Sequence, residues 1–99
     1  MKVIGNFQAC DLNLRILATT YATGHIAFAI ETEEGEPCGC LSVNVPDVVL
    51  EPGEFIAKTW AENEPLREPA LATGLFQDTG KRIEVGFCEG EIWRQVQVH

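Results

Sequence analysis

Hydrophobic and polar residues alternate along three stretches in the first half of the chain. The stretches are Asp11–Tyr21, with Leu17 as an exception, His25–Glu31 and Pro37–Val45. Alternation with a period of two is typical of a strand that buries one face. The residues predicted to face inward are Leu12, Leu14, Ile16, Ala18, Ile26, Phe28, Ile30, Leu41, Val43 and Val45. Turn residues separate the stretches, so we predict an antiparallel meander.

The register between the second and third stretches follows from the same pattern. Their inward residues must share one face, because a shift of one residue would turn a strand over. Pairing Phe28 with Leu41 and Ile26 with Val43 meets this condition. The pairing needs a tight turn centred on Glu34-Gly35, where glycine readily adopts a positive φ.

The second half of the chain has weaker strand patterns. We expect a loop over Pro46–Gly53 and a short strand over Glu54–Trp60. Two closing strands are predicted at Ile83–Phe87 and Glu91–Val98, joined around Glu89-Gly90.

One helix is predicted between these strands. It runs from about Glu64 to Thr73, with Asn63 as its cap and Pro65 in its first turn. Gly74 follows the last turn, where a glycine commonly ends a helix. Pro69 would interrupt the interior, so the helix is expected to be short or kinked.

Length and composition indicate a single globular domain over residues 1–99. Hydrophobic residues make up 45% of the chain, which excludes a disordered protein. No apolar run reaches the ~20 residues of a membrane span, and the first residues lack the apolar core of a signal peptide. We therefore expect an α+β protein of the cytoplasm, with a curved antiparallel sheet of about five or six strands and one short helix.

The net charge of −8 is concentrated in the middle of the chain. Residues 31–68 hold ten acidic and two basic residues, whereas the remainder holds five of each. Such a surface repels nucleic acids and anionic membranes. Two interpretations remain open: the charge keeps the protein in solution, or it binds a basic partner by imitating a phosphate backbone.

Six short motifs follow one another in a specific order between Tyr21 and Phe87. They are Tyr21–Gly24, Gly35–Pro37, Ser42–Pro46, Phe55–Asn63, Asp78–Gly80 and Gly86–Phe87. This pattern resembles a family of small bacterial proteins of unassigned function that occur in genomes, plasmids, integrative elements and phages. Ser42 stands where the family more often has threonine, and the two prolines of the helix also depart from its pattern. The resemblance implies a fold and an association with mobile elements, and it implies no catalytic residues.

The candidate binding residues are glutamates of the acidic middle section. The densest cluster surrounds the predicted Glu34-Gly35 turn, and a second lies at the predicted helix start. They are Glu31, Glu33, Glu34, Glu36, Glu62 and Glu64. Paired carboxylates such as Glu62 and Glu64 suit acid–base chemistry or cation binding, but acidic residues are also favoured at a helix N-terminus by the helix dipole.

A rival interpretation is a polar pocket on one sheet face, formed by Tyr21, His25, Ser42 and Asn44. Ser42 is the only serine, and His25 is the only histidine apart from the terminal residue. A catalytic Ser–His pair needs hydrogen-bond reach and a third, orienting group. The alternatives are a small-molecule binder or small enzyme using this pocket, or ordinary polar residues on a partly solvated face.

The cysteines predict no metal site. Cys38 and Cys40 share a strand face, with Cys88 and His25 as further potential ligands. In the predicted register His25 lies beside Asn44, four residues of strand, or ~13 Å, from the position of Cys40. Zinc–ligand bonds are only about 2 Å long. Without a secretion signal, we expect four reduced thiols and neither a metal nor a cofactor.

Two remaining features have structural interpretations. Asp78-Thr79-Gly80 is the tripeptide of retroviral-type aspartic proteases, whose chemistry needs two aspartates and a long following segment. Only 19 residues follow Gly80, so we expect an Asx-type turn before the last hairpin. Trp60 and Trp93 are expected in the core, or at an interface if exposed.

These observations predict a non-enzymatic, protein-binding accessory factor of a mobile element or phage. One specific version is an acidic inhibitor of a nucleic-acid-binding defence complex, of the anti-CRISPR or anti-restriction type. The acidic residues would then compete for a basic groove of the partner, with no direct nucleic-acid or membrane binding. The sequence does not specify the oligomeric state.

Overall fold

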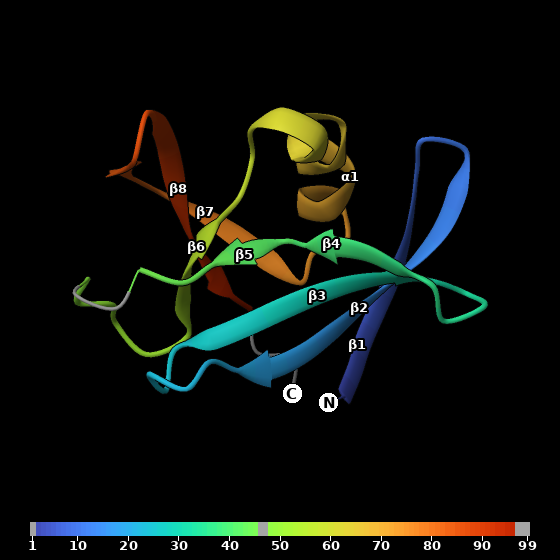
Figure 1. Cartoon of the computed structure of the whole chain (residues 1–99), viewed down its shortest axis with the longest axis horizontal. Helices are drawn as coiled ribbons and strands as arrows, with labels where there is room; N and C mark the ends of the chain where they lie inside the picture. Colours follow the sequence, from blue (N-terminus) through green and yellow to red (C-terminus); the bar gives the residue numbers. More distant parts are fainter. Residues whose placement is uncertain (1, 46–47, 97–99) are drawn as a thin grey trace.

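The computed structural model describes residues 2–45 and 48–96, which form two four-stranded antiparallel sheets and a short helical segment (Figure 1). The first sheet has the order β1-β2-β3-β4, and the second has the order β5-β6-β8-β7. The strands are β1 (Lys2–Ala9), β2 (Leu12–Thr20), β3 (Ile26–Thr32), β4 (Pro37–Cys40), β5 (Ser42–Val43), β6 (Glu54–Ala57), β7 (Phe76–Val85) and β8 (Cys88–Gln95). The α+β class is confirmed, whereas the single sheet of five or six strands is wrong.

The predicted strand Pro37–Val45 is divided between the two sheets at Leu41. The Leu41 N–H donates to the Phe28 carbonyl at 2.9 Å, and the Leu41 carbonyl accepts from the Lys58 N–H at 2.7 Å. Leu41 and Ser42 are consecutive and both buried, so the alternation of the pattern breaks at this crossing. The continuous segment Pro37–Val45 thus contributes a strand to each sheet, which explains why the sequence suggested a single sheet.

The predicted register is correct next to the crossing, but it shifts by one residue towards the turn, where Glu31 pairs with Pro37, and it is wrong beyond the crossing. Ala29 pairs with Cys40, and the hydrogen bond from Leu41 to Phe28 continues that register. Val43 does not pair with Ile26, because it has already joined β6 opposite Ile56.

The first strand of the chain has no counterpart in the sequence prediction. Only Phe7 and Ala9 are buried in β1, and a bulge between Val3 and Gly5 interrupts its alternation. A Cβ at Gly5 would meet the end of the Leu75 side chain, so a larger residue there would force that side chain to move. β1 pairs along its length with β2, in which Leu14 and Ile16 are buried as predicted. Leu12 was predicted to face inward but is exposed, and Leu17 is buried against the alternation.

The helical segment begins earlier than predicted and changes type at its middle. A 3-10 helix, η1 (Ala61–Leu66), leads into α1 (Arg67–Ala72). Pro65 lies in η1 and Pro69 lies in the first turn of α1, where the missing N–H has no helical partner to lose. Gly74 follows the end with φ of 77° and donates to the Leu71 carbonyl, as expected of a terminating glycine.

The closing hairpin is confirmed, but its turn lies elsewhere. β7 and β8 are joined at Gly86-Phe87 rather than at Glu89-Gly90. Gly90 is buried within β8, where Ile56, Ile83 and Val85 lie close to the position of a Cβ. The Asp78 Oδ1 atom accepts from the Gly80 N–H at 2.9 Å, so the Asx-type bond forms as expected. It forms inside β7, at a bulge between Asp78 and Lys81, and not before the hairpin.

The two sheets enclose a core built around four aromatic side chains. Phe28, Phe55, Phe76 and Trp93 pack edge-to-face or tilted, with ring centroids 4.5 to 6.0 Å apart. Trp93 is fully buried, as expected, whereas Trp60 is only half-buried. The helical segment contacts both β1 and β7 and covers the core between them (Figure 1). In the described part of the chain, neither helix is long and apolar enough to cross a membrane.

Phe28→Ala tests the core. Phe28 is fully buried between the rings of Phe55 and Phe76, so we expect the substitution to lower the free energy of unfolding by about 3–5 kcal/mol. The matched control is Phe87→Ala at a fully exposed position, which should change stability by less than about 0.5 kcal/mol. Chemical denaturation measures both, and equal effects would contradict the assigned core.

Candidate functional site

The turn between β3 and β4 presents exposed carboxylates on a well-defined backbone. The Thr32 N–H donates to the Glu36 carbonyl, the Gly35 N–H donates to the Thr32 carbonyl, and the Glu36 N–H donates to Thr32 Oγ1. Gly35 has φ of 88°, which confirms the predicted need for glycine. These bonds hold Glu33, Glu34 and Glu36 at the surface.

The four glutamates of this turn are not equivalent. Glu31 lies within β3 and forms an ion pair with Arg15 at 2.8 Å. Glu33, Glu34 and Glu36 form no ion pair within residues 2–45 and 48–96. The turn therefore carries three uncompensated negative charges over four residues.

The second predicted cluster lies on η1. The Glu62 carboxylate accepts a hydrogen bond from Lys58, which lowers the pKa of Glu62, while Glu64 is exposed. Asn63, between them, does not cap the helix as predicted. Its Nδ2 donates to the Cys40 carbonyl at 2.6 Å and to the Lys58 carbonyl at 3.1 Å, and the residue is buried.

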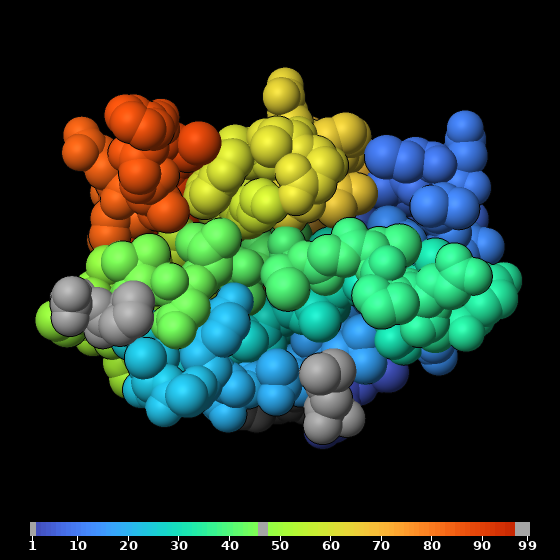
Figure 2. Space-filling model, in the orientation of Figure 1, coloured from blue at the N-terminus to red at the C-terminus, as the bar shows by residue number. Residues whose placement is uncertain are grey.

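Asn63 also shows how the two acidic clusters are related. It attaches η1 to the end of β4, and β4 begins directly after Glu36. The clusters thus lie at opposite ends of a four-residue strand, or about 13 Å apart along its backbone. The space-filling view shows β4 running beneath the helical segment on the same face of the molecule (Figure 2).

The structure joins Tyr21 to Ser42 in the rival pocket, whereas Asn44 is bonded to Thr23, which the prediction did not include. The Tyr21 and Ser42 hydroxyls lie 2.9 Å apart, and Thr23 Oγ1 donates to Asn44 Oδ1 at 3.1 Å. Ser42 Oγ also accepts from the Phe28 N–H at 2.9 Å, and Ser42 is only 3% exposed. The Ser42 hydroxyl therefore links β3, β5 and the β2–β3 turn.

His25 lies in a different surrounding from Ser42. Its carbonyl accepts from the Tyr21 N–H, and its half-buried side chain lines a shallow hollow formed with residues 50–54. No hydrogen bond joins His25 to Ser42 within the described residues, so the geometry of a catalytic pair is not present there.

Arg67 organises an ion-pair network that the sequence pattern did not indicate. Arg67 Nε lies 2.9 Å from Glu91 Oε2, and its Nη2 lies 3.2 Å from Asp78 Oδ2. Arg82 also binds Asp78, at 2.9 Å. Trp93 Nε1 donates to Glu91 at 3.0 Å. The network fastens α1 to β7 and β8, and only the folded topology brings its members together.

The pKa of each carboxyl in this region is set by its partners. Burial raises the pKa of Glu91, but hydrogen bonds from Arg67 and Trp93 outweigh burial and leave the pKa below its ordinary value. The Arg82 hydrogen bond lowers the pKa of Asp78 in the same way. Glu54, only 5% exposed, has its pKa lowered mainly by Lys81.

The four cysteines are all free thiols, with Cys10 and Cys40 exposed. Among the described residues, no three histidine, cysteine, aspartate or glutamate side chains form a group suited to a metal ion. The expectation that no metal or cofactor is needed stays a prediction.

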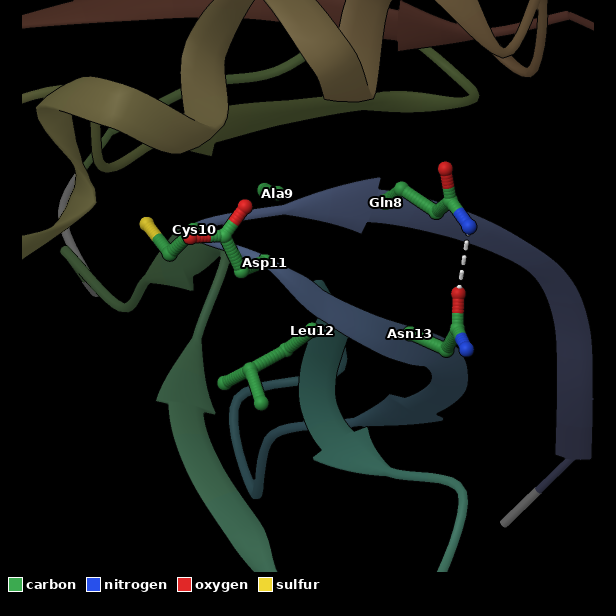
Figure 3. Close-up of a pocket in the computed structure, with 6 residues that line it drawn as sticks. All are labelled: Gln8, Ala9, Cys10, Asp11, Leu12 and Asn13. Atoms are coloured by element: carbon green, nitrogen blue, oxygen red, sulfur yellow. Dashed lines mark hydrogen bonds between the residues drawn. The ribbon is translucent and has the colours of Figure 1, made fainter.

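The β1–β2 hairpin forms a surface hollow of about 490 Å³, lined by Gln8–Asn13 (Figure 3). Gln8 Nε2 donates to Asn13 Oδ1 at 2.7 Å across the two strands, so these side chains satisfy each other. All of the lining comes from one hairpin, with no opposing element to enclose a ligand. The hollow therefore lacks the convergent walls of a small-molecule site.

Comparison of the chain with protein-family models, curated proteins and solved structures gives no significant match. The resemblance to small proteins of mobile elements thus stays a prediction, as does localisation in the cytoplasm.

The lowered carboxyl pKa values predict a pH dependence of stability. Since the folded-state pKa of Asp78, Glu91 and Glu54 lies below the unfolded value, their contribution is fully present above about pH 4.5. It is lost as pH falls through the folded-state pKa. We expect Tm to fall steeply in that acidic range and Arg67→Met to flatten the fall.

The control for this pH series is Lys2→Met. Lys2 forms no ion pair within residues 2–45 and 48–96, so its loss should leave the slope of Tm against pH unchanged. Thermal melts at closely spaced pH values supply the comparison. Identical slopes for Arg67→Met and the wild type would show that the network does not set the acid response.

The β1–β2 turn predicts a stabilising substitution. Cys10 and Asp11 have φ of 52° and 61°, as a type I′ turn requires, but such turns favour Asn-Gly. The double substitution Cys10→Asn and Asp11→Gly should raise the free energy of unfolding by roughly 1 kcal/mol, because it relieves left-handed backbone strain. Cys10→Ala removes the thiol but keeps the strain, so it should give no gain. Loss of stability in the double variant, measured by denaturation, would count against this turn.

Proposed function

We propose that this protein is a non-enzymatic module that binds another protein through the acidic surface beside β4. One observation carries the proposal: the β3–β4 turn holds Glu33, Glu34 and Glu36 exposed and without ion-pair partners among the described residues. The hydrogen bonds of Thr32, Gly35 and Glu36 already fix the turn. Binding through a preformed turn loses little conformational entropy, which favours affinity.

The protein's own cations do not compensate this charge. Four of the seven basic residues pair with carboxylates away from the turn: Lys58, Arg67, Lys81 and Arg82. Arg15 lies beside the turn, where it donates to the Thr32 carbonyl, but its ion-pair partner is Glu31 and not Glu33, Glu34 or Glu36. The negative field of the turn therefore extends into solvent. Such a field attracts a basic surface and accelerates its diffusional encounter.

A partner that complements this negative charge is a protein with a groove lined by lysine and arginine. Grooves of this kind hold phosphate backbones in nucleic-acid-binding proteins, and closely spaced carboxylates offer them a similar density of negative charge. The specific version of the proposal is an inhibitor of a nucleic-acid-binding defence complex, of the anti-CRISPR or anti-restriction type. The resemblance to small phage and plasmid proteins supports this version. The same charge disfavours direct contact with nucleic acid or anionic membranes.

The rival function, a small enzyme or small-molecule binder, has less support. It depends on Tyr21, His25, Ser42 and Asn44 acting together. The Ser42 hydroxyl is buried and already bonded to Tyr21 and to the Phe28 N–H. Freeing it for chemistry would leave a buried N–H without a partner, which costs about 1–3 kcal/mol.

Glu34→Lys tests the proposal against Glu51→Lys as its matched control. Both glutamates are exposed, and both substitutions change the net charge equally. A partner is first captured from lysate of cells that produce the protein and then purified. We expect Glu34→Lys to slow association with it at least about tenfold at low salt, because electrostatic steering is lost. Glu51→Lys should have a much smaller effect.

Ionic strength provides the second measurement. The wild-type association rate should fall as salt rises, and the rate for Glu34→Lys should depend on salt more weakly. The purified partner should also release a bound oligonucleotide when the wild-type protein is added. The proposal would be contradicted if Glu34→Lys bound the partner normally and the association rate did not depend on salt. The acidic turn would then serve only to keep the protein in solution.

A further inference from the structure

Phe87 is fully exposed at the tip of the β7–β8 hairpin. Val85 pairs with Cys88, so Gly86 and Phe87 form a two-residue turn. Gly86 has φ of 61°, and glycine at the first position is typical of a type II′ turn. The second position of such a turn has no requirement for an aromatic residue, and polar residues are usual there. The turn geometry therefore accounts for Gly86 but not for Phe87.

The hairpin tip stands away from the rest of the protein. In Figure 1 the joined ends of β7 and β8 extend beyond β6 and clear of α1. Figure 2 shows the same hairpin, in orange, as a projection separated from the helical segment by a notch. A side chain at this tip can enter a concave surface that the body of the protein could not reach.

Two glutamates directly oppose each other just below the tip. Glu84 pairs with Glu89 across the hairpin, and both are exposed. Like charges directly opposite in an antiparallel pair are destabilising. Arg82 compensates little, because its guanidinium is bonded to Asp78 at 2.9 Å, while its Nε lies 4.0 Å from Glu89. Within the described residues, no cation forms an ion pair with Glu84.

An exposed phenylalanine and an opposed pair of glutamates both act against the stability or solubility of the isolated hairpin. A single binding partner accounts for both. We propose that the β7–β8 tip inserts Phe87 into an apolar pocket of a protein partner, whose rim carries lysine or arginine facing Glu84 and Glu89. This inference rests on the proposal that the protein binds another protein, but not on the acidic β3–β4 turn being the contact.

The charges of Glu84 and Glu89 favour this protein partner over a lipid bilayer or a second copy of the chain. Burial of Phe87 in a lipid bilayer would carry Glu84 and Glu89 to an interface, where anionic head groups repel them and desolvation is costly. A two-fold contact with a second copy would bring four carboxylates together. A pocket with a basic rim instead converts the repulsion within the hairpin into two favourable ion pairs.

The first test places the photocrosslinking residue p-benzoylphenylalanine at position 87 of the full chain. Irradiation in cells that naturally produce the protein should yield an adduct with one other protein. Mapping of the crosslinked peptide should locate it in an apolar pocket flanked by lysine or arginine. The overturning results are no adduct, an adduct with a second copy of this chain, or a crosslinked surface without basic residues.

The second test measures affinity for that crosslinked partner after purification. Phe87→Ala should weaken binding at least about thirtyfold, as expected for a central aromatic anchor. Val49→Ala is the matched control, because Val49 is also an almost fully exposed apolar residue. The affinity of the Val49→Ala variant for the partner should equal that of the wild type. Unchanged affinity for Phe87→Ala would overturn the inference, and so would binding of the wild type, but not of Phe87→Ala, to phosphatidylcholine–phosphatidylglycerol vesicles.

The glutamate pair gives a readout that a purely structural role would not produce. Glu84→Gln with Glu89→Gln should raise Tm, because the cross-strand repulsion is removed, yet slow association with the partner severalfold. A higher Tm with an unchanged association rate would show that the rim carries no complementary charge.

The same partner separates this inference from the proposed function. Loss of binding in Phe87→Ala with normal binding in Glu34→Lys supports the hairpin anchor and rejects the acidic turn. The reverse pattern supports the acidic turn and rejects the anchor. Loss in both variants means that the partner contacts both turns.

Discussion

Leu41 is hydrogen-bonded to both sheets, and this double attachment determines how their inner faces meet. Its N–H is held by Phe28 in the first sheet, and its carbonyl is held by Lys58 after the end of β6 in the second. Phe28 is thereby brought against Phe55, with ring centroids 4.5 Å apart. The crossing at Leu41 and the packing of aromatic rings from both sheets therefore support each other.

The arrangement of the sheets and the helical segment determines which charged residues form ion pairs. Arg67 on α1 meets Glu91 and Asp78 because the helical segment closes over the second sheet, and Lys81 reaches the buried Glu54. Cations are thus bound to carboxylates of the protein body, where lower solvent exposure strengthens the pairs. The glutamates of the hairpin tips at residues 33–36 and at Glu84 are left without such partners. Unpaired negative charge is therefore present at both of these projecting turns.

The polar groups that suggested chemistry are largely used to hold the fold together. Ser42 accepts the Phe28 N–H, Asn63 binds the carbonyls of Cys40 and Lys58, and Asp78 fixes the bulge of β7. In contrast, the exposed features at the β3–β4 and β7–β8 turns contribute nothing evident to the fold. A binding module is consistent with this division, because turns on a rigid scaffold can present contacts without disturbing the core.

Local pattern was sufficient where the determining interaction was local. Alternation predicted β2 and β3, Gly35 predicted the turn between β3 and β4, and Gly74 predicted the end of the helix. The inward face also determined the register of Phe28 with Leu41, since only that register keeps both side chains in the core. The concentration of glutamates was evident from the sequence, because charge along a chain needs no fold to be counted.

Only the tertiary structure decided the features that depend on distant partners. The division of Pro37–Val45 between two sheets, the burial of Gly90 against Ile56, and the inward role of Asn63 each require a contact from another part of the chain. The exposure of Phe87 belongs to the same class, because a phenylalanine in a short motif looks like a core residue until its neighbours are placed. Periodicity reports which face of an element is apolar, but only packing determines which elements meet and which tips remain in solvent.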